Sequence, residues 1–128
     1  IPSTAEHILS VGAYDSRTLT YADFSGRGDT RDGRRKPDLT APGVRIMTTA
    51  PGGGYTEATG TSFATPFATG AAALLLQWGI VDGNDPYLYG EKAIAYLKKG
   101  TRPLPAYAEY PNPEVGWGRL CLSESIPK

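Results

Sequence analysis

The feature that most constrains the fold is an apolar run over residues 62–78. Its central part, 68–76, carries no charged side chain and is apolar on every side when its residues are placed with helical periodicity. A helix without a polar face is expected to be surrounded by protein. Pro66 falls near its beginning, where backbone N–H groups lack intrahelical partners in any case. The run therefore predicts a long buried helix.

Short segments with strand-like composition precede this helix. Residues 7–11 predict a buried strand, 18–24 a second strand or an extended turn, and 44–49 a strand between two Ala-Pro-Gly turns. A glycine-rich approach, 52–61, leads into the helix. Strands followed by a buried helix predict an α/β arrangement, with too few strands to close a balanced sheet.

The last third of the chain predicts a second helix over 89–99, which Gly100 is expected to end. Residues 101–113, rich in proline and tyrosine, predict an extended surface segment. A final short strand or turn is expected over 116–120.

Charge and cysteine content exclude several classes of function. Thirteen basic and thirteen acidic residues give a net charge of zero, which argues against nucleic acid as a partner because no basic face is available for phosphates. The apolar run 70–76 is too short to cross a bilayer, so no membrane span is predicted. Cys121, the single cysteine, forms no internal disulfide and is interpreted as a small buried hydrophobic residue.

The segment Gly60-Thr61-Ser62 places a serine in the first turn of the predicted helix. Unpaired N–H groups and the positive end of the helix dipole lie there, and they would stabilise an oxyanion formed when Ser62 attacks a carbonyl. Serine is also a preferred N-cap residue, and capping alone is the commoner meaning of such a pattern. The local pattern nominates Ser62 as a nucleophile and leaves capping open.

A wider resemblance carries the assignment further. Residues 60–66 (GTSFATP) and the small residues after them resemble the serine signature of the subtilase family, the subtilisin-like serine proteases of peptidase family S8. Further segments resemble the same family in the same order: 8–15, 24–28, 36–44 and 116–120. The stretch 85–113 also resembles clostridial subtilases, including those of spore germination.

The resemblance implies that residues 1–128 form the C-terminal segment of a peptidase S8 catalytic domain. The fold expected from it is α/β: the C-terminal portion of the subtilisin-like fold, a parallel sheet with a central buried helix that carries the nucleophile, incomplete as a domain. The sequence begins at Ile1 without methionine, and we expect the upstream part of the domain to precede it. Open strand edges and exposed apolar surface are then expected to make the isolated fragment self-associate.

The activity implied is that of a serine endopeptidase that forms an acyl-enzyme at Ser62. Ser62 matches the nucleophile, its N–H matches one oxyanion-hole donor, and the Thr61 hydroxyl matches a support of that hole. Thr59 and Phe67 stand where many relatives have asparagine and histidine. The triad aspartate and histidine precede this segment in the family, so the isolated fragment is expected to be inactive.

Other residues receive structural interpretations. His7, the only histidine, is interpreted as a strand-edge residue instead of a catalytic base. Many relatives use calcium, but Asp29, Asp32 and Asp38 fit no recognised ligand loop and are interpreted as solvated carboxylates. No cofactor is required, and no metal-ligand set is identified.

The expected partners are a protein or peptide substrate and the upstream part of the same domain. A secreted or cell-envelope location, including association with spores, is expected from the family alone. The alternative function is a non-catalytic subtilase-like scaffold or binding protein, and a third reading is a small self-standing binding module with a capped helix.

Overall fold

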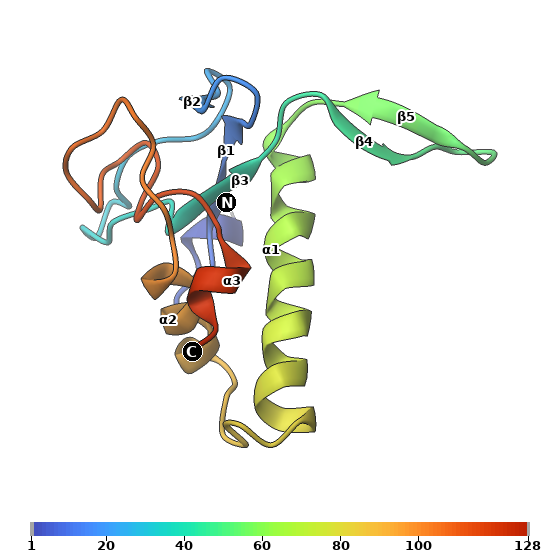
Figure 1. Ribbon diagram of the computed structural model, residues 1–128. Helices are drawn as coiled ribbons and strands as arrows, with labels where there is room; N and C mark the ends of the chain where they lie inside the picture. The colour runs from blue at the N-terminus through green and yellow to red at the C-terminus, as the bar shows by residue number, and fades with distance from the viewer. Residues whose placement is uncertain (1, 128) are drawn as a thin grey trace.

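The computed structural model describes residues 2–127. Within these residues, the strands come in the first half of the chain and the α-helices follow them (Figure 1). The strands are β1 (Val11–Asp15), β2 (Thr20–Tyr21), β3 (Leu39–Pro42), β4 (Ile46–Thr49) and β5 (Tyr55–Ala58). The helices are η1 (Pro2–Thr4, 3-10), α1 (Thr61–Leu76), η2 (Gln77–Val81, a π-helical turn), α2 (Glu91–Lys99) and α3 (Leu122–Ser125).

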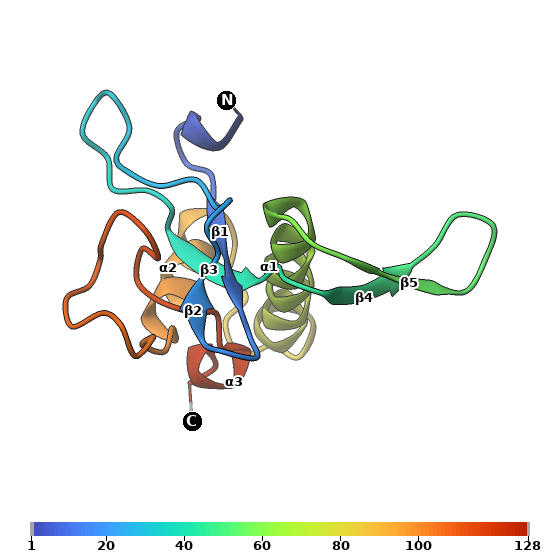
Figure 2. The same cartoon turned by 90° about the horizontal axis from the view of Figure 1, so that it is seen from above.

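The main sheet has the strand order β2-β1-β3. β1 and β3 are parallel, with Val11 opposite Leu39 and Ala13 opposite Ala41, whereas β2 is antiparallel to β1. β4 and β5 form a separate antiparallel hairpin that extends away from the other elements (Figures 1 and 2). The predicted α/β arrangement is confirmed, and a single parallel strand pair is indeed too little to make a balanced sheet.

Helix α1 packs against β1 and β3 through small side chains. The buried residues of this face are Ala64, Ala68, Ala71 and Leu75. Ala13 and Ala41 of the strands are fully buried beneath it, so helix and sheet approach closely. The opposite face is open, with Phe67 and Leu74 44% and 54% exposed. The expectation of a helix surrounded by protein is therefore met on one face only, because residues 2–127 supply no neighbours for the other.

Together α1 and η2 form an apolar helix, Thr61–Val81, of 21 residues, in which an 18-residue stretch has mean hydropathy 1.3. By length and composition it could cross a membrane, so the run 70–76 alone understated its extent. The core helix of an α/β domain has the same length and composition, and the contacts of α1 with β1, β3 and α2 are those of such a helix.

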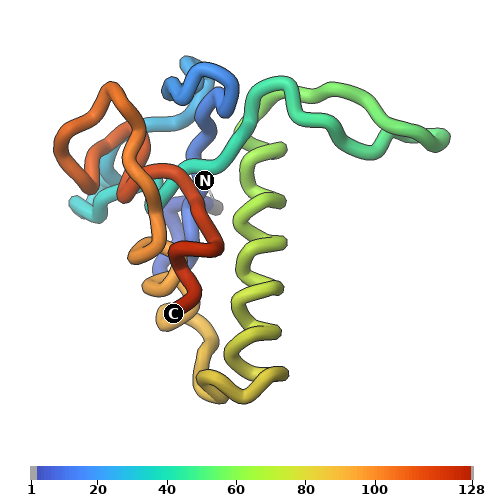
Figure 3. Tube along the Cα trace, in the orientation of Figure 1, coloured from blue at the N-terminus to red at the C-terminus, as the bar shows by residue number. Residues whose placement is uncertain are grey.

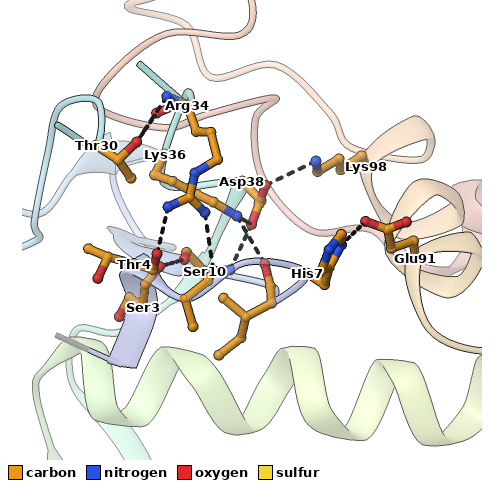
Figure 4. Close-up of polar contacts among 12 residues, drawn as sticks. Ser3, Thr4, His7, Ser10, Thr30, Arg34, Lys36, Asp38, Glu91 and Lys98 are labelled. Carbon is orange, nitrogen blue, oxygen red and sulfur yellow. Dashed lines mark hydrogen bonds and ion pairs between the residues drawn. The ribbon is translucent and has the colours of Figure 1, made fainter. Parts of the chain in front are cut away.

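The first strand begins at Val11, four residues later than predicted. Ahead of it, His7 has a left-handed backbone with φ 60°. The Ile8 carbonyl accepts a hydrogen bond from Lys36 Nζ, and the Ser10 N–H donates to the Asp38 carboxylate. Side chains satisfy these two backbone groups (Figure 4). Within the described part of the chain, only Ser10 O, which accepts the Asp38 N–H at 2.9 Å, pairs with the backbone ahead of β3, so the segment forms no strand.

Two strands were not predicted from the sequence. β3 ends in a proline and is only four residues long, and β5 lies in the stretch interpreted as a glycine-rich approach. β4 starts at Ile46 instead of residue 44 because Arg45 adopts a left-handed conformation with φ 53°. The short β2 is consistent with the weak alternation over 18–24.

The second predicted helix is confirmed as α2, with Gly100 as its C-cap. The chain then loops back to the sheet, as the orange and red part of Figure 3 shows. Thr40 N–H donates to Gly118 O, and Leu120 N–H donates to Thr40 O, so the expected final strand is a single bridge alongside β3. Gly116 has φ 59°, and a Cβ at this position would overlap the backbone oxygens of Pro37 and Asp38.

Candidate functional site

Ser62 is the second residue of α1, and its side chain is exposed. The N-cap residue is Gly60, without a side-chain capping bond, while Gly60 O accepts the Phe63 N–H at 3.0 Å. Within residues 2–127, neither Oγ nor N–H of Ser62 makes a hydrogen bond. The capping interpretation of Ser62 is therefore wrong, and its hydroxyl and amide are both available to a ligand.

Two glycines hold the serine-bearing turn against the sheet. Gly60 has φ 155° and ψ 161°, a region that is open essentially to glycine alone. Its N–H donates to Gly43 O at 2.8 Å. A Cβ on Gly43 would lie 2.6 Å from Ala13 Cβ and 2.9 Å from Gly60 O, so only glycine permits this approach. Since Gly43 follows β3 directly, Ser62 lies at the carboxyl ends of the parallel strands, where α/β proteins bind ligands.

A hollow of ≈ 330 Å³ opens beside Thr61. It lies between the N-terminal segment, the loop over 26–30 and the start of α1, and small side chains line much of it. The residues lining it are Ser3, Thr4, Ser10, Val11, Gly12, Gly26, Arg27, Gly28, Asp29, Thr30, Lys36, Pro37 and Thr61. The serine-bearing turn therefore borders a space that is large enough for a side chain of a ligand.

His7 is exposed and pairs through Nδ1 with Glu91 of α2. The Glu91 carboxylate raises the pKa of His7 above its ordinary value through this hydrogen bond. The strand-edge interpretation of His7 needs correction, because His7 lies in a left-handed turn ahead of β1. No hydrogen bond joins it to Ser62, whose side chain has no partner among residues 2–127.

Asp38 is the most buried carboxylate of the polar cluster in Figure 4, with its side chain 2% exposed. It accepts the Ser10 N–H at 2.7 Å, Lys36 Nζ at 2.6 Å and Lys98 Nζ at 3.0 Å. Lys36 Nζ also donates to Ile8 O at 2.9 Å. The prediction of a solvated carboxylate is thus wrong for Asp38, which joins the N-terminal segment, β3 and α2.

Asp29 and Asp32 are partly exposed and are bound by arginines, Asp29 by Arg35 at 2.9 Å and Asp32 by Arg34 at 3.0 Å. With Asp38 held by lysines, none of the three aspartates is directed at a shared point. Among the residues that the structure describes, no group of three or more His, Cys, Asp or Glu side chains is arranged to hold a metal ion.

Cys121 lies just ahead of α3 and is half-buried, which is less burial than its interpretation as a small buried hydrophobic residue predicts. Its Sγ lies 3.3 Å from Ser123 Oγ, and this hydrogen bond lowers the pKa of the thiol. The thiol has no contact with the serine-bearing turn among the interactions of residues 2–127.

The structure has a parallel strand pair, followed at its carboxyl end by a glycine turn and an apolar helix. The first turn of this helix carries a free serine. This is the arrangement of a subtilisin-like α/β protein. The chain belongs to the subtilase family, whose family model matches residues 1–88.

The chain is similar to several proteases. It is 35% identical to the serine protease AprX of Bacillus subtilis over 120 residues, which cover 78% of this chain and 26% of AprX. It is 40% identical to the cell wall-associated protease of the same species over 74 residues, 58% of this chain and 8% of that protein. The structure of the Clostridium perfringens CspB protease matches with a TM-score of 0.92 and 44% identity, over 98% of this chain and 27% of CspB.

The chain thus spans about a quarter of the length of AprX and of CspB. The predicted resemblance to subtilases and the predicted subtilisin-like fold are confirmed, and a clostridial subtilase is among the similar structures. The 128 residues match part of a larger protease structure.

Proposed function

We propose that Ser62 is the nucleophile of a serine endopeptidase of the subtilisin type. The observation that carries this proposal is that Oγ and N–H of Ser62 are both unbonded within residues 2–127, at the N-terminal end of α1. The positive end of the α1 dipole favours the negative charge that develops in an acyl-transfer reaction at this position.

In the proposed reaction, Ser62 Oγ attacks the carbonyl carbon of a peptide bond and gives its proton to a base. The carbonyl oxygen becomes an oxyanion that accepts a hydrogen bond from the Ser62 N–H, with the Thr61 hydroxyl as a support of the same oxyanion hole. Collapse expels the amine, which takes up the proton, and leaves an acyl-enzyme that water hydrolyses. Acyl transfer of this kind needs no cofactor.

The base and the carboxylate that orients it are proposed to come from upstream residues of the intact protein. His7 is the only histidine among the 128 residues, and Glu91 already engages it. The open face of α1, where Phe67 and Leu74 are exposed, supports packing against that upstream part. On this proposal the isolated 128 residues are inactive and self-associate through the uncovered apolar face.

The proposed substrates are proteins or peptides, and the proposed location is the cell envelope or the outside of the cell. The cell wall-associated protease of B. subtilis supports this location. Association with spores rests on the clostridial resemblance. Calcium, where relatives use it, would need ligands other than Asp29, Asp32 and Asp38, because arginines and lysines already neutralise all three.

Labelling with a fluorophosphonate tests the proposal, because the reagent phosphonylates activated serines with loss of fluoride. The intact protein is expected to be labelled, Ser62→Ala is expected to lose the label, and the Thr65→Ala control, in the same helix, is expected to keep it. A folded intact protein without label at Ser62 would favour a non-catalytic subtilase-like scaffold. Turnover by the isolated 128 residues that depends on Ser62 would refute the upstream origin of the base.

A further inference from the structure

Backbone hydrogen bonds connect the serine-bearing turn to the end of β1. Gly43 N–H donates to Tyr14 O at 3.1 Å, and Gly60 N–H donates to Gly43 O at 2.8 Å. Next to this ladder, Arg45 N–H donates to the Thr59 hydroxyl oxygen at 2.9 Å. The Thr59 hydroxyl therefore fixes the peptide just before Gly60, and Gly60 in turn leads directly into Thr61 and Ser62.

The partner of this hydroxyl has a strained backbone. Arg45 has φ 53°, a left-handed conformation that residues with a Cβ adopt at a cost. Such a conformation persists only where surrounding contacts hold it. Besides the bond to Thr59, the Arg45 guanidinium lies 3.5 Å from the Asp15 carboxylate, and Asp15 also accepts the Arg17 N–H at 2.9 Å. Contacts on both sides of Arg45 thus link the end of β1 to the turn before Ser62.

We propose that Thr59 is a positioning residue for Ser62, with Arg45, anchored by Asp15, as its partner. This inference rests on the proposed function and extends it. The hydroxyl acts through the backbone: it sets the orientation of the 59–60 peptide, and that orientation directs Oγ and N–H of Ser62. Thr59 itself does not touch the substrate.

The contribution of the Thr59 hydroxyl can be tested separately from that of the rest of the turn. Thr59→Val keeps the shape and the branching of the side chain but removes the acceptor for Arg45 N–H, whereas Thr59→Ser keeps the acceptor. Thr56 of β5 provides the matched control. It is exposed, it lies in the same hairpin, and its hydroxyl makes no hydrogen bond among the described residues. Thr56→Val is therefore the same chemical change without the link to Arg45.

Kinetics on a peptide substrate, with active sites titrated by fluorophosphonate, test the inference in the intact protein. Small displacements of reacting groups are costly, so Thr59→Val is expected to lower kcat by about 10-fold to 100-fold with little change in KM. Thr59→Ser is expected to restore kcat, and Thr56→Val to leave it as in the unsubstituted protein. The melting temperature of each variant reports the purely structural effect.

An unchanged kcat in Thr59→Val would overturn the inference. A loss of activity that merely follows the fraction of folded protein, with normal kcat per titrated site, would also overturn it. If the unsubstituted protein takes no label at Ser62, the proposed function itself fails and this inference falls with it. Labelled unsubstituted protein together with fully active Thr59→Val would instead refute the positioning role alone.

Discussion

Asp38 and Asp32 allow a quantitative prediction of how burial changes the contribution of an ion-paired carboxylate to stability. Both carboxylates are in ion pairs with nitrogen–oxygen distances of 3.0 Å or less, but the Asp38 side chain is 2% exposed and the Asp32 side chain 57%. Replacement of each by asparagine is the same chemical change in a buried and in an exposed environment. The pair of variants therefore isolates the effect of burial.

In Asp38→Asn, Lys36 and Lys98 lose their counter-charge, and the Lys36 side chain is only 17% exposed. Breaking a buried ion pair from one side costs about 3–5 kcal/mol, because the remaining charge stays buried without compensation. The amide also directs an N–H₂ group at the Ser10 N–H or at one of the ammonium groups. In Asp32→Asn, Arg34 can return to water, and the expected loss is small because exposed ion pairs contribute little to stability.

Urea unfolding of the intact protein, followed by circular dichroism, measures the difference between the two variants. We expect the free energy of unfolding to be lower in Asp38→Asn than in Asp32→Asn by about 2–4 kcal/mol. High salt should shrink the Asp32→Asn effect, since exposed charges are screened, and should change the Asp38→Asn effect much less. Losses within about 1 kcal/mol of each other would refute the reasoning that burial decides what these carboxylates contribute.

Three further predictions rest on single contacts or faces. Gly116→Ala should destabilise the protein by about 2 kcal/mol or more beyond Gly83→Ala in thermal unfolding, because both positions have positive φ but only the first leaves no space for a Cβ; equal melting temperatures would contradict this. The Glu91 carboxylate raises the pKa of His7, so this contact stabilises the fold at low pH and is lost as pH rises through the folded-state pKa. An NMR titration of the single histidine should show that Glu91→Gln lowers its pKa, and an unchanged titration would remove Glu91 as the cause. Sedimentation of the isolated 128 residues should show oligomers, and Leu74→Glu should reduce their population. A monomer at all concentrations would mean that the open face of α1 does not mediate self-association.

Local sequence determined much of the fold. The apolar run over 62–78 predicted α1 because a stretch of this length without charged residues is readable without knowledge of its neighbours. Helix α2 was equally local, with a glycine at its end. The serine of the first turn could be nominated for the same reason, since glycine, serine and helix start are adjacent in the chain.

What the sequence did not show depends on partners far along the chain. β3 exists because it pairs with β1, 28 residues earlier, and its four residues carry no strand signal strong enough to outweigh the proline. The burial of Asp38 depends on Lys98, 60 positions away, which no local pattern reveals. Gly43 could have been noticed, because a glycine directly after a proline and before a β-branched run indicates a close approach, but its neighbour at Gly60 required the structure.

The β4–β5 hairpin extends from the protein like an arm, and it is fixed at its base and free at its tip. At the base, Gly43 and Gly60 touch, so neither can change without moving Ser62. At the tip, a Cβ on Gly52, Gly53 or Gly54 would meet no atom within 4 Å. The arm is consequently a natural place for length variation: residues inserted at its tip lengthen it without reaching the serine, and related chains can diversify there at little cost to the geometry of the site.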